Sequence, residues 1–116
     1  MIMDSFIIYY ISQRMNSIGF TRFVYEPIMV IMPEGQQEYV IEGVNEYYYL
    51  TSRILAAGIE IEADNNYFKA DESYVNLDYS RFQEFTGQIK IKAPGGKIAI
   101  EFIRVIPQIT ITTNQP

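Results

Sequence analysis

The amino-acid sequence predicts a mainly β protein: an antiparallel β-sandwich of jelly-roll-like type with one short N-terminal helix, in a single domain over residues 1–116. The first observation is compositional, since nineteen Ile and ten Tyr stand against three Leu, and β-branched and aromatic residues favour sheet. An AT-rich genome would enrich the same residues whatever the fold. The second observation is therefore decisive: polar and apolar residues alternate in about seven or eight short segments, between residues 21 and 113, with turn signals between them.

The N-terminal segment is the exception, because its apolar residues recur at helical spacing. These residues are Ile7, Ile8, Ile11, Met15 and Ile18. Ser5 or Asp4 can cap a helix and Gly19 can end one, which predicts an amphipathic helix at about 5–17. The competing interpretation is a strand, since residues 6–11 have strong β propensity. The apolar stripe of such a helix is expected to pack on its own domain.

The clearest strands lie near the C-terminus. Residues 88–92 alternate, residues 93–96 (Ala-Pro-Gly-Gly) form a turn, and alternation resumes through Phe102. The pattern predicts a hairpin in which Ile91 faces Ile98 and Ile89 faces Ile100. These four isoleucines are expected on one buried face.

Two further signals concern strand ends and edges. Apolar residues occupy even positions up to Phe102 and odd positions from Ile103, which predicts a β-bulge or a strand that leaves one sheet for another. Pro27 interrupts the apolar segment 23–32, so this segment is predicted to be an edge strand or two short strands. Gly43 predicts a bulge or a bend.

A second hairpin is predicted over residues 58–71. Ile59 and Ile61 alternate with glutamates, and Asn65-Asn66 suits a two-residue turn. In that register Glu62 faces Lys69, a favourable cross-strand pair.

Composition also excludes several kinds of chemistry. The chain has no Cys and no His, which excludes disulfides, thiolate nucleophiles, serine–histidine catalysis and histidine-ligated metals. We therefore expect no enzyme and no cofactor. A net charge of −5 without a basic patch argues against nucleic-acid partners. No apolar run is long enough for a transmembrane segment, and residues 6–11 lack the basic region of a signal peptide.

The charged clusters are explained more simply as solvated surface groups than as metal-binding or catalytic sites. Asp64, Asp71, Glu72 and Asp78 could form a loose calcium site, but the segment fails the EF-hand pattern, and solvated turn carboxylates are the simpler interpretation. Glu60 and Glu62 resemble a glycosidase pair only by spacing. Lysines 90, 92 and 97 are expected to protect an exposed sheet edge. No metal site is predicted.

The tyrosines are the best candidates for a functional surface. Tyr is enriched at protein interfaces, and ten tyrosines are more than a small core can hide with every hydroxyl satisfied. Alternation places Tyr47 and Tyr49 on one face of their strand and Tyr48 on the other. The candidate interface residues are Tyr47, Tyr48, Tyr49, Tyr67, Tyr74 and Tyr79.

In length, lack of Cys and His, and Ile-rich strands such as Ile89-Lys90-Ile91 and Ile98-Ala99-Ile100, the chain resembles the single jelly-roll minor capsid proteins at the vertices of tail-less icosahedral phages. The resemblance implies a non-catalytic structural subunit of a virion, assembled in the host cytoplasm, whose partners are other protein subunits in a homo-oligomer or a capsid. Outside a virion, a cytoplasmic protein is expected. The alternative function is a small carbohydrate- or ligand-binding β-sandwich module.

Overall fold

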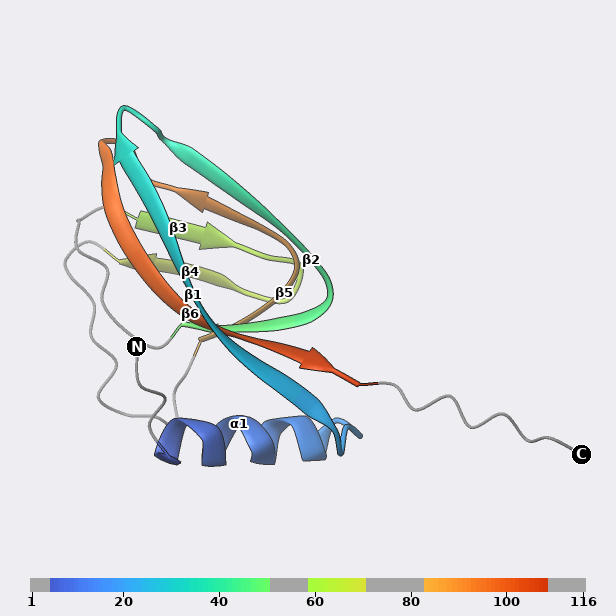
Figure 1. The fold of residues 1–116 in the computed structure, drawn as a ribbon. Helices are drawn as coiled ribbons and strands as arrows, with labels where there is room; N and C mark the ends of the chain where they lie inside the picture. The colour runs from blue at the N-terminus through green and yellow to red at the C-terminus, as the bar shows by residue number, and fades with distance from the viewer. Residues whose placement is uncertain (1–4, 51–58, 71–82, 109–116) are drawn as a thin grey trace, which may run out of the picture.

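The protein is mainly β, as predicted. A computed structural model describes residues 5–50, 59–70 and 83–108 (Figure 1). In these residues one helix, α1 (Ser5–Ser17), precedes six strands, so the helical interpretation of the N-terminal segment is confirmed. The strands are β1 (Phe23–Glu34), β2 (Glu38–Leu50), β3 (Ile59–Glu62), β4 (Tyr67–Ala70), β5 (Gln83–Lys92) and β6 (Gly96–Pro107).

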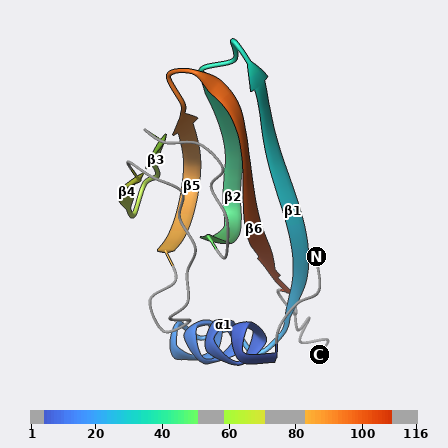
Figure 2. The same ribbon diagram turned by 90° about the vertical axis from the view of Figure 1, so that its left-hand side faces the viewer.

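The six described strands belong to one antiparallel sheet with the order β1-β6-β2-β5-β3-β4. Figure 2 shows them side by side in this order, with α1 lying across their lower end. Strand β1 forms one edge of the sheet, which confirms the edge position predicted from Pro27. The described strands thus form a single hydrogen-bonded sheet, and the predicted sandwich of two separate sheets is not confirmed.

The long strands form one ribbon that is folded over. Glu34 of β1 pairs with Gly96 of β6, and Glu38 of β2 pairs with Lys92 of β5. Because Glu38 lies four residues after Glu34 and Lys92 lies four residues before Gly96, the β1–β6 register continues unchanged into the β2–β5 register. A backbone hydrogen bond of 2.9 Å from the Ala93 amide to the Gln37 carbonyl lies between these two pairs. Residues 23–34 therefore pair with residues 96–107, and residues 38–43 with residues 87–92, in one register. The ribbon bends at the two connections, residues 35–37 and 93–95, which lie beside each other.

The predicted hairpin between β5 and β6 is therefore wrong. β5 pairs with β2 and β3, whereas β6 pairs with β1 and β2. The turn signal at Pro94-Gly95 was correctly placed, but the chain crosses there from one layer of the folded ribbon to the other. The predicted burial is confirmed, because Ile89, Ile91, Ile98 and Ile100 all lie in one core.

This inner core fills the space between the two layers. β1 and β6 supply one wall, and β2, β5 and the β3–β4 hairpin supply the other (Figure 1). Its buried side chains include Val30, Met32, Tyr48, Ile59, Ile61, Phe85 and Phe102. Full burial of each large apolar side chain contributes roughly 1.5–3 kcal/mol to stability, which explains why an Ile-rich ribbon folds over.

The phase change at Phe102–Ile103 marks a second core on the opposite face of the sheet. The β1–β6 register runs through Ile28↔Phe102 and Pro27↔Ile103 without a shift, so neither a bulge nor a change of sheet occurs there. Instead, α1 covers the odd-numbered face of the lower half. The buried side chains of this helix core are Ile7, Ile11, Met15, Tyr49, Ile103 and Val105.

Strand β2 contains the bulge predicted at Gly43. Gly43 pairs with Gly87 and Tyr47 with Thr86, so Val44, Asn45 and Glu46 have no counterparts on β5. After the bulge, β2 pairs with both β5 and β6 through Tyr47–Leu50. These pairings join the two layers at the lower end.

The β3–β4 hairpin is confirmed, but its predicted register is wrong. Glu62 pairs with Tyr67, and Glu60 with Lys69, around a loop closed by a 2.8 Å bond from the Ala63 amide to the Asn66 carbonyl. The two asparagines do not form a free two-residue turn, because their side chains bind β5. The shift of register gives Glu62 a different partner, Lys92 of β5, at 3.4 Å.

Candidate functional site

A polar pocket of about 350 Å³ lies beside the β2 bulge, where α1, β2, β5 and the β3–β4 loop meet. The bulge creates it, because three unmatched residues push β2 away from β5 at this level. The pocket is lined by Arg14, Ile18, Asn45, Glu46, Tyr47, Asn65, Glu84, Thr86 and Gly87.

Glu84 holds these elements together. Arg14 of α1 donates from Nε to Oε2 at 2.8 Å and from Nη2 to Oε1 at 3.1 Å. The Tyr49 hydroxyl donates to Oε2 at 2.6 Å, and Asn65 Nδ2 lies 3.4 Å from Oε1. Four donors occupy the lone pairs of one carboxylate, so Glu84 is suited to a structural role rather than to acting as a base.

The same contacts fix the protonation of both main partners. Burial, and then the hydrogen bond to Glu84, raise the pKa of Tyr49 far above its ordinary value. The hydrogen bond to Glu84 is also the main cause that raises the pKa of Arg14. Tyr49 is therefore a neutral donor and Arg14 a cation throughout the physiological range.

Three other polar side chains on the pocket wall have no hydrogen-bond partner in the part of the chain that the structure describes. Among the described residues, nothing hydrogen-bonds the side chains of Asn45, Tyr47 or Thr86, although the Thr86 amide donates to Asn65 Oδ1 at 2.9 Å. Asn45 has a φ of 62°, in the left-handed region, where Asn is better tolerated than most residues. The three side chains can bind a molecule that enters from solvent.

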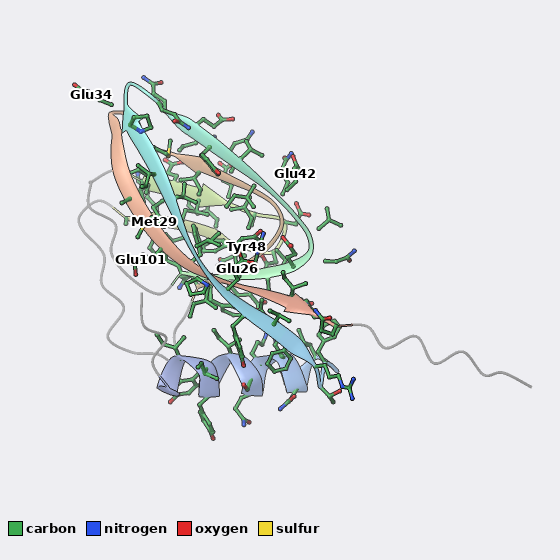
Figure 3. All side chains as sticks on the ribbon, in the orientation of Figure 1. Glu26, Met29, Glu34, Glu42, Tyr48 and Glu101 are labelled. Carbon is green, nitrogen blue, oxygen red and sulfur yellow. The ribbon has the colours of Figure 1, made fainter. Side chains whose placement is uncertain are left out.

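A second polar network lies where β1, β6 and β2 cross. The Tyr48 hydroxyl donates to Glu46 Oε1 at 2.7 Å, and Arg104 forms ion pairs with Glu26 and, at 3.9 Å, with Glu46. Burial, and then the bond to Glu46, raise the pKa of Tyr48 to about 12. The hydrogen bond to Glu26 is the main cause that raises the pKa of Arg104. Figure 3 shows Tyr48 and Glu26 together at this crossing.

The structure separates the tyrosines predicted to form one interface. Tyr48 is 2% and Tyr49 3% exposed, each with its hydroxyl bound to a glutamate, so these two are interior residues. Their predicted placement on opposite faces is confirmed, because Tyr48 belongs to the inner core and Tyr49 to the helix core. Tyr47 is half-buried beside the pocket, and Tyr67 is 55% exposed on β4. Tyr74 and Tyr79 lie outside the described residues.

Exposed apolar side chains also lie on β1. Ile31 is 65% and Met29 48% exposed, and Ala99 pairs with Ile31 on β6. We call Met29, Ile31 and Ala99 the β1 outer face. It continues upward from the odd-numbered face that α1 covers below, and Figure 3 shows Met29 and Glu101 on the side of β1 and β6 away from β2. The sequence predicted this edge but not its exposure.

The predicted charged clusters carry no site among the described residues. No three acidic side chains there could hold a metal ion. Of the weighed calcium ligands, only Asp64 is described. Lys90 and Lys92 belong to β5, between β2 and β3, so their predicted role at a sheet edge is wrong. The one described helix is not long and apolar enough to cross a membrane.

Sequence reasoning missed Arg14 and Glu84, which lie seventy residues apart and match no motif. Gly43, as a bulge signal, and Tyr47, as a candidate interface residue, pointed to this region. No protein-family model, curated protein or solved structure matches the chain.

Proposed function

We propose that this protein is a non-catalytic structural subunit of a larger protein assembly, most concretely a small capsid or vertex protein of a virion. The observation that carries the proposal is strand β1, a twelve-residue strand at the edge of the sheet, one side of which pairs with none of the other described strands. A row of unpaired backbone donors and acceptors on such an edge pairs readily with another chain.

The composition of β1 supports this role. Monomeric proteins protect edge strands with lysines, prolines, inward-pointing charges, bulges or covering loops. β1 contains Pro27 and Pro33 but no Lys or Arg, and its segment from Ile28 to Met32, between the two prolines, contains neither a charge nor a proline. The β1 outer face adds exposed apolar side chains beside that edge. An edge of this kind suits a strand whose partner is a neighbouring subunit.

The opposite edge of the described sheet is different. β4 has four residues, including Lys69, and its exposed apolar side chain is Tyr67. Short, charged strands resist strand-to-strand association. This contrast favours β1 over the tyrosine side of the sheet as the proposed subunit contact.

The test measures solution mass by light scattering across about a hundredfold range of concentration, where association obeys mass action. We expect reversible association, abolished by Ile31→Lys together with Met29→Lys. Tyr67→Lys is the matched control, with one charge added at the other edge, and should associate as the parent chain does. Association lost only in the Tyr67 variant would refute the β1 contact, and a monomer at every concentration would refute assembly from like subunits.

A further inference from the structure

We infer that the pocket beside the β2 bulge binds a small, neutral, polyhydroxylated ligand of the sugar or cyclic polyol class. The inference goes beyond assembly and does not depend on it, because the pocket and the β1 outer face are built from different residues. Its volume, about 350 Å³, falls within the range of roughly 300–1,000 Å³ typical of small-molecule sites.

The charges on the pocket wall argue against an ionic ligand. Arg14 is already paired with Glu84 through two hydrogen bonds, and Glu46 accepts from Tyr48 and faces Arg104. A phosphate could reach the N–H groups of Arg14 that Glu84 leaves free, but the negative charge of Glu84, 2.8 Å from Arg14 Nε, would repel it. A cation bound by Glu84 would displace the donors that this mostly buried carboxylate holds, which is costly.

The groups that remain available are neutral and can both donate and accept hydrogen bonds. They are the Asn45 amide, the Tyr47 hydroxyl and the Thr86 hydroxyl. Tyr47 pairs with Thr86 across β2 and β5, and Asn45 precedes Tyr47 by two residues in the bulge. Ligand hydroxyls also donate and accept, so they match this set better than a carbonyl or an amine does.

The pocket also offers an apolar surface. Tyr47 and Ile18 are half-buried on its wall. The Phe20 and Tyr47 rings pack edge-to-face with their centroids 6.1 Å apart, which restricts the orientation of the Tyr47 ring. A sugar ring has C–H groups that pack on an aromatic face while its hydroxyls bind polar neighbours. The Tyr47 ring and the three neutral polar groups together form a small site that can bind a sugar ring in one orientation.

The backbone at the site is held in place as well. Gly87 has a φ of 77°, and a Cβ atom there would collide with the Asp64 carboxylate. The Asp64 amide in turn donates to the Thr86 carbonyl at 3.1 Å. The wall formed by Thr86 and Gly87 is therefore preorganised, which reduces the entropy cost of binding.

The test is amide NMR titration of the full chain with methyl glycosides of glucose, galactose, mannose and N-acetylglucosamine, and with myo-inositol. Each probe is added up to about 50 mM, beyond the millimolar dissociation constants expected of a shallow site. We expect saturable shifts at Asn45, Thr86 and Gly87 for at least one probe. Tyr47→Phe and Asn45→Gly should each weaken that binding about five- to tenfold while the spectrum stays folded.

Tyr67→Phe is the matched control, since it removes an exposed tyrosine hydroxyl that does not line the pocket, and it should leave the affinity unchanged. Three results would overturn the inference: no saturable shift with any probe, shifts that the two pocket variants do not weaken, or saturable shifts at these amides with inorganic phosphate or calcium in place of the sugars.

Discussion

Arg14 and Glu84 form a two-point ion pair, with distances of 2.8 and 3.1 Å, that fastens the helix to the sheet. The pair is asymmetric, because the Arg14 side chain is half exposed whereas the Glu84 side chain is mostly buried. An exposed ion pair alone contributes little. Glu84 matters more because it also satisfies the buried Tyr49 hydroxyl.

Replacing Glu84 by Gln should therefore destabilise the fold. The substitution removes the negative charge and places an amide donor where two donors already point, which costs about 1–3 kcal/mol. Urea unfolding measures the loss. Glu42→Gln is the control, since Glu42 is an exposed residue that accepts from Gln88, and it should change stability by less than about 0.5 kcal/mol. Equal effects of the two substitutions would contradict the role of Glu84.

Tyr49→Phe tests the same network from the opposite side. Loss of the hydroxyl leaves one Glu84 oxygen with a missing donor, and we expect a cost of about 1 kcal/mol. The aromatic ring still fills the helix core, so the loss should come without unfolding. Tyr67→Phe removes an exposed hydroxyl and should be neutral in the same urea experiment.

Gly43→Ala should be far more harmful than Gly95→Ala. A Cβ atom at Gly43 would lie 2.8 Å from the Tyr48 ring and 2.9 Å from the Gly87 carbonyl oxygen, whereas none of the described atoms lies within 4 Å of one at Gly95. Because Tyr48 is fixed in the inner core, overpacking should cost about 1–3 kcal/mol. Thermal unfolding compares the two variants, and similar melting temperatures would count against the described bulge.

Stability should fall at alkaline pH. Burial raises the pKa of Tyr48 to about 12 from an ordinary value of 10.0, and raises that of Tyr49 further. The folded state then holds protons that the unfolded chain has already released, so stability is constant below pH 10 with respect to these groups and declines above it. Ultraviolet titration of phenolate should show both tyrosines ionising only as the protein unfolds. Early ionisation of all ten tyrosines in folded protein would refute their burial.

Ile11→Ala tests the packing of α1. Ile11 is fully buried against Ile103 and Val105, and truncation should cost about 2–4 kcal/mol. Tyr9→Ala on the exposed side of the helix is the control and should have little effect. If the two substitutions cost the same, the helix does not pack through this stripe.

Much of the fold was predictable from local pattern, and pairing was not. Alternation identified the buried isoleucines and the two faces around Tyr48, because burial depends on the period of a strand. It could not show that Ile91 and Ile98 face each other across a core rather than across a ladder, since both arrangements bury the same side chains. The bulge or change of sheet predicted from the phase change at Ile103 is wrong, because alternation could not show that a helix covers the opposite face of the strand there.

The candidate site was less predictable for a related reason. Asn45 and Glu84 become neighbours of one pocket only because the bulge shifts the register of β2 against β5. Neither residue belongs to a motif, and no spacing connects Glu84 with Arg14. Two of the tyrosines predicted at an interface, Tyr48 and Tyr49, are instead satisfied in the interior by glutamates that composition alone does not locate.

The folded ribbon has a consequence for synthesis on the ribosome. Phe23 pairs with Pro107 and Met32 with Ile98. The first described strand to be synthesised, β1, therefore cannot pair until the last, β6, has been synthesised. Contacts that are distant in sequence slow folding, and unpaired apolar strands aggregate during the delay. Until β6 emerges, β1 lacks the strand with which it pairs in the described sheet. The nascent chain is therefore expected to depend on chaperones most strongly while its central third is being translated.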